Sequence, residues 1–289
     1  MTFRSPIFEL SHNYVDEAAA LSPMDCTYLG NGLNQDKLDD FSIAGAQESA
    51  DLTKATLAKL IALKPIDEID RVAKSVMVER LTSSLDLHDS FESHLSFNVL
   101  TSPPADIRQV FEMMPKESAT DFENIAKRLL AVDKAHLSWI STIDTLAKKG
   151  KTVAQRQIDG IAKQLEGYAN GGYVGMAKTF DPDGKYPAIH EAAKAAGASA
   201  AETAKYLRGT YMALATPNDA VGAEPFELLV DGVLQALDDR HRRHHGSHAY
   251  DDAEGGQETA EAVRADRVQG GAQAFCHIKQ QHISSPGWG

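Results

Sequence analysis

The chain has 289 residues, enough for one large or two ordinary domains with a substantial core. Its 43% hydrophobic and 24% charged residues exclude a disordered protein, and its formal net charge of −12 argues against nucleic acid or an anionic membrane as a partner. Only Cys26 and Cys276 are present, and no apolar run approaches the ~18 residues of a membrane span. We therefore predict a cytoplasmic protein in a reducing compartment.

The first hundred or so residues show the spacing of amphipathic helices, with apolar residues every three or four positions. A helix is predicted over residues 6–21, followed by a loop over residues 24–42. Ser42 can cap a second helix that runs to about Leu63, and Pro65 suits the first turn of a third. An apolar stripe on this third helix is predicted to be core: Ile66, Ile69, Val72, Val76, Met77, Leu81 and Leu85.

Later helix starts are indicated by capping boxes, in which a hydroxyl caps a backbone N–H and a residue three positions later reaches back. The pairs with this spacing are Thr120 with Glu123, Thr152 with Gln155, and Ser199 with Glu202. The corresponding helices are expected to end near Gly150, Gly171 and Pro217. Residues 95–100 are ambiguous between helix and strand, and no convincing period-two strand occurs. The fold class is therefore predicted as all-α, an irregular multi-helix array.

The composition changes near Arg240, where the chain becomes rich in Gly, His and Gln. We predict a helical domain over residues 1–239 and a divergent, poorly structured tail over residues 240–289. Four histidines in the tail are close enough in sequence to bind a transition metal: His241, His244, His245 and His248. A Gly-rich segment does not fix the geometry of a metal site, so only adventitious binding is expected there, and no metal site is assigned.

The most specific local pattern lies in residues 210–231, where a helical pattern gives way to a turn. Asp219 belongs to this turn, and Gly222 can take a positive φ just before an acidic and an aromatic residue, Glu224 and Phe226. These four residues are candidates for binding a substrate or shaping a cleft. Glu224 could equally pair with a buried arginine or cap the helix that follows, so both the functional and the structural role remain open.

No catalytic residue can be assigned from a motif. Helical zinc peptidases commonly use His-Glu-x-x-His, because histidines four positions apart face the same side of a helix. The His-Glu pair of this sequence, His190 and Glu191, is followed by Lys194 where the second histidine would stand. No P-loop, dinucleotide-binding loop or Gly-x-Ser-x-Gly elbow is present either. Three histidines in amphipathic segments are predicted to be structural: His88, His94 and His136.

Four segments occur in a suggestive order: LSPMDCTYLG, SPPADIRQVFEMMP, ENIAKRLLAV and YLRGTYMALATPNDAVGAEPF. Their order over residues 5–237 resembles the N-terminal part of the bacterial family catalogued as domain of unknown function 885, most specifically in Asp219-Ala-Val-Gly222-x-Glu224-x-Phe226. Members of that family are similar to helical, gluzincin-type zinc peptidases. The resemblance implies peptide ligands and a zinc cofactor for longer relatives, whose metal motif lies in their C-terminal half. It transfers no metal ligand or cofactor to this chain.

Two interpretations follow from this resemblance. In the first, the chain is the helical scaffold half of a zinc-peptidase-like protein, altered in frame or truncated near residue 238, and its partner is the missing C-terminal catalytic half. In the second, it is a complete, non-catalytic helical module that binds peptides or other proteins. In both cases we predict no autonomous peptidase activity.

Overall fold

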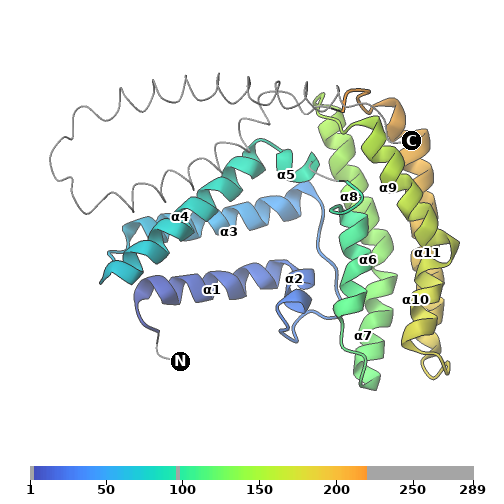
Figure 1. Ribbon diagram of the computed structural model, residues 1–289, viewed down its shortest axis with the longest axis horizontal. Helices are drawn as coiled ribbons and strands as arrows, with labels where there is room; N and C mark the ends of the chain where they lie inside the picture. The colour runs from blue at the N-terminus through green and yellow to red at the C-terminus, as the bar shows by residue number, and fades with distance from the viewer. Residues whose placement is uncertain (1–2, 96–97, 220–289) are drawn as a thin grey trace, which may run out of the picture. The chain divides into compact units, whose positions relative to one another are not determined.

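The computed structural model describes residues 3–95 and 98–219, which all lie in one compact unit (Figure 1). Helices dominate these residues, and their only strand-like feature is an isolated parallel β-bridge between Ala154 and Thr216. The all-α prediction is confirmed for this part of the chain. Among the same residues, no helix is long and apolar enough to cross a membrane.

The helices fall into an early and a late group along the chain. The early group comprises α1 (Pro6–Leu21), α2 (Pro23–Tyr28), α3 (Ile43–Ala62), α4 (Glu68–Asp89) and α5 (Glu92–Leu95). The late group comprises α6 (Pro103–Met113), α7 (Ala119–Leu130), α8 (Val132–Ala147), α9 (Gln155–Gly167), α10 (Tyr173–Phe180) and α11 (Pro187–Gly209). A π-helical turn, η1 (Tyr168–Gly172), joins α9 to α10, and a 3₁₀ turn, η2 (Tyr211–Ala213), follows α11.

The starts of the early helices follow from side chains that cap free backbone N–H groups. The Ser5 hydroxyl accepts hydrogen bonds from the first turn of α1, which spans the predicted residues 6–21. Ser42 accepts one from the first turn of α3, as predicted. Asp67 caps α4, so this helix begins after Pro65 and not with Pro65 in its first turn. The predicted loop after α1 is also wrong at its start, because Ser22 caps a further helix, α2, with Pro23 in its first turn.

The predicted core stripe of α4 is only partly buried. Leu81 is fully buried, whereas Ile66 and Ile69 keep 63% and 55% of their surface exposed and Val76 keeps 46%. The physical reason is that α4 packs mainly against α3, with smaller contacts to α1 and α5, and that α3 and α1 lie on one side of it (Figure 1). The periodicity correctly indicated a helix, but the outer part of its apolar face has no neighbouring helix among the described residues.

Two of the later helix starts differ from the predicted capping boxes. Before α7 the box is formed by Ser118 and Asp121, two residues earlier than predicted, and the helical stretch is interrupted at Ala131. No side chain caps α9. Its first residues instead pair with the segment after α11, where the Gln155 N–H donates to the Thr216 carbonyl at 2.8 Å. The Thr152 box is therefore wrong.

The third predicted box is wrong because Ser199 lies inside α11, where its hydroxyl contacts the His136 ring at 3.0 Å. Two predicted helix ends are confirmed by backbone geometry. Gly150 follows α8 with a φ of 75°, and Gly171 takes a φ of 110° at the kink between α9 and α10. Glycine adopts such left-handed conformations without the steric cost that other residues meet.

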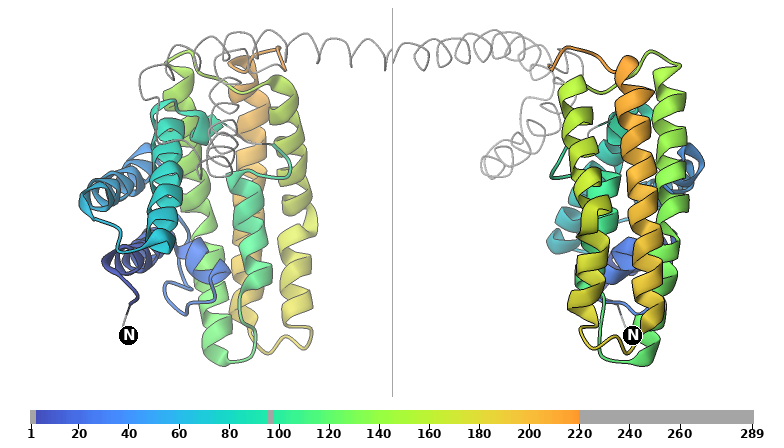
Figure 2. Two further views of the ribbon diagram at one scale, coloured as in Figure 1. Left: turned by 60° about the vertical axis from the view of Figure 1, so that its left-hand side comes forward. Right: turned by 90° about the vertical axis from the view of Figure 1, so that its right-hand side faces the viewer.

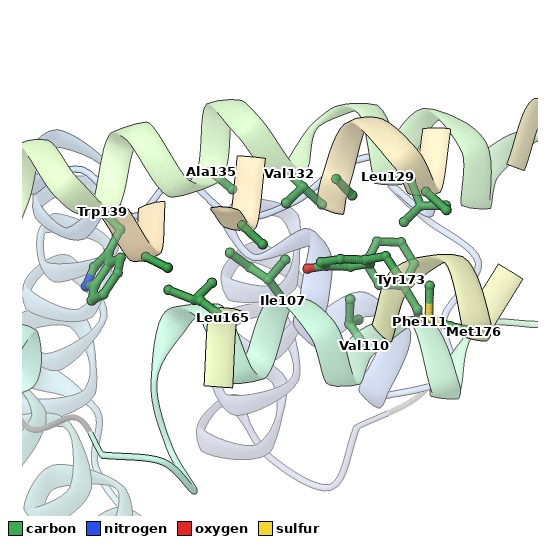
Figure 3. Close-up of a cluster of buried hydrophobic side chains, with 14 of the residues drawn as sticks. Ile107, Val110, Phe111, Leu129, Val132, Ala135, Trp139, Leu165, Tyr173 and Met176 are labelled. Carbon is green, nitrogen blue, oxygen red and sulfur yellow. The ribbon is translucent and has the colours of Figure 1, made fainter. Parts of the chain in front are cut away.

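The described residues bury two hydrophobic clusters. In the larger one, α11 packs against α7, α8, α9 and α10, and Figure 2 shows it between the α7–α8 and α9–α10 segments. Phe111 and Trp139 are among its largest buried side chains, and Figure 3 shows Trp139 at one end of the row of labelled residues. The smaller cluster lies between α1, α3 and α4 and is built on Ile7, Leu60 and Leu81.

Candidate functional site

Of the predicted cleft residues, the structure describes Asp219 alone. Its carboxylate accepts a hydrogen bond from the Arg156 side chain of α9 at 2.8 Å, and both side chains are exposed. Gly222, Glu224 and Phe226 lie outside the described residues, as do His241, His244, His245 and His248. The cleft-shaping role of the four candidates therefore stays a prediction, and Asp219 is the member whose contact is known.

The backbone places Asp219 beside the start of α9. The Thr216 N–H donates to the Val153 carbonyl at 3.1 Å, and the Gln155 N–H donates back to Thr216. This short pairing holds the chain after η2 against α9, which brings Asp219 within reach of Arg156. An exposed ion pair of this kind contributes little to stability, so it orients the segment more than it strengthens the fold.

The His-Glu pair near the start of α11 makes contacts that leave no zinc site. His190 Nε2 lies 3.0 Å from the carboxylate of Asp181, while the Glu191 carboxylate accepts a bond from Lys194 at 2.7 Å and is exposed to solvent. Zinc needs three or four ligands that converge on one point. No group of three or more histidine, cysteine or acidic side chains converges in this way in the described part of the chain. The residues at this position therefore do not fit a zinc ion.

Asp181 organises the turn between α10 and α11. Its buried carboxylate accepts hydrogen bonds from the backbone N–H groups of Lys185 and Tyr186 as well as from His190. Burial acts to raise the pKa of Asp181, but the bonds from Tyr186, His190 and Lys185 outweigh it and hold that pKa below its usual value. The carboxylate is thus ionised at neutral pH and serves the fold of the turn.

Arg128 of α7 is a fully buried cation that sequence reasoning missed. Its guanidinium donates to the Thr27 hydroxyl at 2.8 Å and to the backbone carbonyls of Pro23 and Asn34 at 3.2 and 3.0 Å. Burial lowers the pKa of Arg128 to about 10, so it remains protonated at neutral pH. A signal was present in the sequence, because Arg128 follows the apolar Ile125 by three positions and so lies on the buried face of the helix.

Asp39, which follows α2 in the chain, bonds back to the start of that helix. Its carboxylate accepts hydrogen bonds from the Ser22 hydroxyl and the Met24 N–H, both at 2.8 Å. Burial raises the pKa of Asp39 above its usual value, although the bonds from Met24 and Ser22 act against this. Asp39 and Arg128 together fix α2 and the chain that follows it, which leads directly into one wall of a pocket.

A pocket of about 280 Å³ lies between the start of α3, α5, the start of α6 and the middle of α8. Its lining includes the carboxylates of Asp40 and Asp106, the rings of Phe41, His94 and Trp139, and the Thr142 hydroxyl. Sequence reasoning did not find this pocket, because its walls come from four helices that are separated along the chain.

The wall at Phe41 is fixed to α8 through the backbone. The Phe41 N–H donates to the Ser138 hydroxyl at 3.2 Å, and the Phe41 carbonyl accepts a bond from Thr142 at 2.8 Å. Burial, together with the charge of Asp39, raises the pKa of Asp106 above its usual value. Burial also lowers the pKa of the His94 ring, with a further contribution from His88. His94 is therefore neutral at pH 7, and the lining that the described residues form includes no lysine or arginine.

Most of the chain matches a protein-family model. The model described as "Bacterial protein of unknown function (DUF885)" matches residues 23–254, which is well over half of the chain. The chain belongs to this family. The resemblance inferred from the order of the segments is thereby confirmed, and the DUF885 match continues past residue 239, where the composition changes. A search of curated proteins found no match.

Proposed function

We propose that this DUF885 chain acts as the helical scaffold portion of a zinc-peptidase-like protein and does not hydrolyse peptides by itself. The main support for the proposal is that His190 and Glu191 each bond to another side chain of the fold. His190 is bonded to Asp181 in the turn before α11, and Glu191 is bonded to Lys194 at the surface. Both side chains thus have structural contacts in place of a shared metal ion.

The other buried charged groups support a scaffold role. Arg128 joins α7 to α2 and to the chain after it, and Asp181 joins α10 to α11. In the early helices, the buried carboxylate of Asp70 accepts a bond from the Ser5 hydroxyl at 2.6 Å, which ties α4 to the start of α1. Each of these polar contacts connects two elements of the fold.

Exposed apolar side chains at the α3–α4 turn support the presence of a partner. Ile61, Ile66 and Ile69 are all more than half exposed there. Apolar side chains gathered at a surface are typical of sites that meet another protein or another domain. We propose the catalytic half of a zinc-peptidase-like protein as this partner, and peptides as the ligands of the assembly.

Peptide hydrolysis by the purified full chain tests the proposal. The chain is incubated with zinc chloride and a mixed peptide library, with and without a chelator, and the products are identified by mass spectrometry. We expect no chelator-sensitive cleavage. Cleavage that follows the protein through two purification steps, depends on zinc and is lost in Glu191→Gln would overturn the proposal, because it would place catalysis at the His-Glu pair.

A non-catalytic binding module is the second candidate function, and the pocket beside Trp139 favours it. Co-expression with the C-terminal half of a longer DUF885 protein separates the two candidates. A stable complex that cleaves peptides supports the scaffold role. Saturable peptide binding by this chain alone, together with no complex, supports the binding module.

A further inference from the structure

We infer that the pocket between α3, α5, α6 and α8 binds an organic cation, namely a primary ammonium group attached to a small apolar or aromatic group. The carboxylates of Asp40 and Asp106 supply the negative charge, Phe41 supplies aromatic surface, and Trp139 lies in the wall. Such a site would bind its ligand whether or not the chain also acts as a peptidase scaffold.

The Asp106 carboxylate is the main reason for this inference. Asp106 is half-buried on α6, yet within the described residues its side chain has no hydrogen-bond or ion-pair partner. A carboxylate that loses water without gaining a partner costs free energy. The raised pKa of Asp106 has the same cause. A cation in the pocket would supply the missing counter-charge, which no lysine or arginine among the described lining residues supplies.

The size and walls of the pocket define the rest of the ligand. Its volume of about 280 Å³ lies at the small end of ligand pockets, which span about 300–1,000 Å³. It therefore suits a group of the size of an amino-acid side chain or a peptide terminus. Phe41 offers aromatic surface, over which an ammonium group is attracted by the electrons of the ring, and the largely buried Trp139 forms part of the wall.

An anion would be the expected ligand if the two nearby helix starts dominated the electrostatics, because helix N-termini carry partial positive charge. The N-terminal turn of α6 contains Pro103 and Pro104, which have no N–H to donate, and Ser102 caps the next N–H. At α3, Ser42 caps the first turn, and the Asp40 carboxylate accepts the N–H of Ser42 at 2.9 Å. Few donors remain for an anion, so the carboxylates determine the sign of the ligand.

Tryptophan fluorescence gives a direct test. The sequence has two tryptophans, so replacing Trp288 by phenylalanine leaves Trp139, in the wall of the pocket, as the sole reporter. Benzylamine is titrated into this variant, with benzyl alcohol and benzoate as ligands of similar shape that are neutral and negative. We expect a saturable change with benzylamine, binding of benzyl alcohol weaker by about tenfold or more, and no binding of benzoate.

Two substitutions in the same background assign the binding to the pocket. Asp106→Asn keeps the shape of the side chain and removes its charge, and we expect it to weaken benzylamine binding about tenfold. Circular dichroism shows whether Asp106→Asn folds. Asp40→Asn, at the exposed rim of the pocket, should also weaken benzylamine binding and serves as the test if Asp106→Asn folds poorly. Asp51→Asn, an exposed residue of α3 outside the lining, is the matched control and should leave the affinity unchanged.

Equal binding of benzylamine and benzyl alcohol would overturn the inference. So would benzylamine affinity that is unchanged in both pocket variants, or benzoate binding tighter than benzylamine, which would show that the helix starts dominate.

Discussion

The α6–α11 region and the α1–α3–α4 region are both built from amphipathic helices, but they bury their apolar faces to different extents. In the first, α11 has helical neighbours on several sides and buries an almost continuous face of small residues: Ala192, Ala193, Ala196, Ala200 and Ala204. In the second, Ile69 and Val76 of α4 and Ile66 in the turn before it are exposed. Burial therefore depends on how many neighbours a helix has, which its own periodicity does not encode.

Buried polar side chains connect elements in both regions. Within the α6–α11 region, His136 of α8 meets Ser199 of α11 in a fully buried contact. In the α1–α3–α4 region, the Ser5 hydroxyl donates to the buried Asp70 carboxylate at 2.6 Å, and Tyr14 contacts Thr53 at 3.2 Å in a half-buried position. Buried polar contacts are more sensitive to change than solvated ones, since an unpaired group there cannot bond to water. The α6–α11 region should dominate the stability of the whole unit, because its buried hydrophobic cluster is the larger of the two.

The largest expected losses in the free energy of unfolding come from removing a buried side chain from each of the two hydrophobic clusters. Phe111→Ala removes a fully buried ring from the α6–α11 region and should lower the free energy of unfolding by about 4 kcal/mol. Leu60→Ala in the smaller core should cost about 3 kcal/mol. Urea unfolding measures both values, and hydrogen exchange locates them. We expect Phe111→Ala to speed exchange throughout α6–α11, and Leu60→Ala to speed it in α1, α3 and α4 only.

If Leu60→Ala were found to speed hydrogen exchange in α9 and α11 as much as in α1, α3 and α4, this result would contradict the separation of the two regions. The two regions would then unfold as one cooperative unit, in spite of their separate buried clusters.

A somewhat smaller effect is expected at Arg128, which joins the late helix α7 to the early helix α2. Arg128→Met keeps much of the apolar stem but removes the donors to Thr27 and to two backbone carbonyls, and we expect a loss of about 3 kcal/mol. Lys127→Met is the matched control on the same helix, because Lys127 pairs with Glu123 at the surface, and it should cost less than about 0.5 kcal/mol. Equal losses in a denaturant titration would contradict a special role for the buried cation.

The sequence was sufficient where local chemistry decides the structure. Apolar spacing predicted α1, Ser42 predicted the start of α3, and Gly150 predicted the end of α8. Such signals succeed because they depend on a few nearby residues. Ser199 was misread for a physical reason. Its spacing to Glu202 is that of a cap, but tertiary contact with His136 holds it in the middle of a helix.

The pocket could not be predicted in the same way. Its two carboxylates, Asp40 and Asp106, are far apart in the sequence and come together only because Phe41 is bonded to α8 while α6 packs on the same helix. Each aspartate alone reads as an ordinary surface residue or a first-turn acid. The cleft candidates Asp219, Gly222, Glu224 and Phe226, in contrast, were predicted from a local sequence pattern. Such a pattern does not reveal which residues they contact.

The smallest of the effects considered depends on pH and falls on the α8–α11 contact. Burial lowers the pKa of His136 to about 4, with a small opposing contribution from Asp133, whereas an unfolded histidine has a pKa of about 6.5. Below pH 6.5 the unfolded chain therefore binds a proton that the folded chain does not. The stability that His136 contributes is fully present above the unfolded pKa and declines as the pH falls towards about 4.

Between pH 7 and pH 5 this proton uptake should lower the free energy of unfolding by about 2 kcal/mol. His136→Asn places an amide near the Ser199 hydroxyl and cannot titrate, so its stability should fall by about 2 kcal/mol less than that of the wild type over the same range. Urea unfolding at the two pH values measures this difference. Hydrogen exchange should place the acid-induced loss in α8 and α11 before α1, α3 and α4. Parallel pH profiles for the two proteins would show that His136 is already solvated, and would contradict a pH-dependent contribution of the α8–α11 contact to stability.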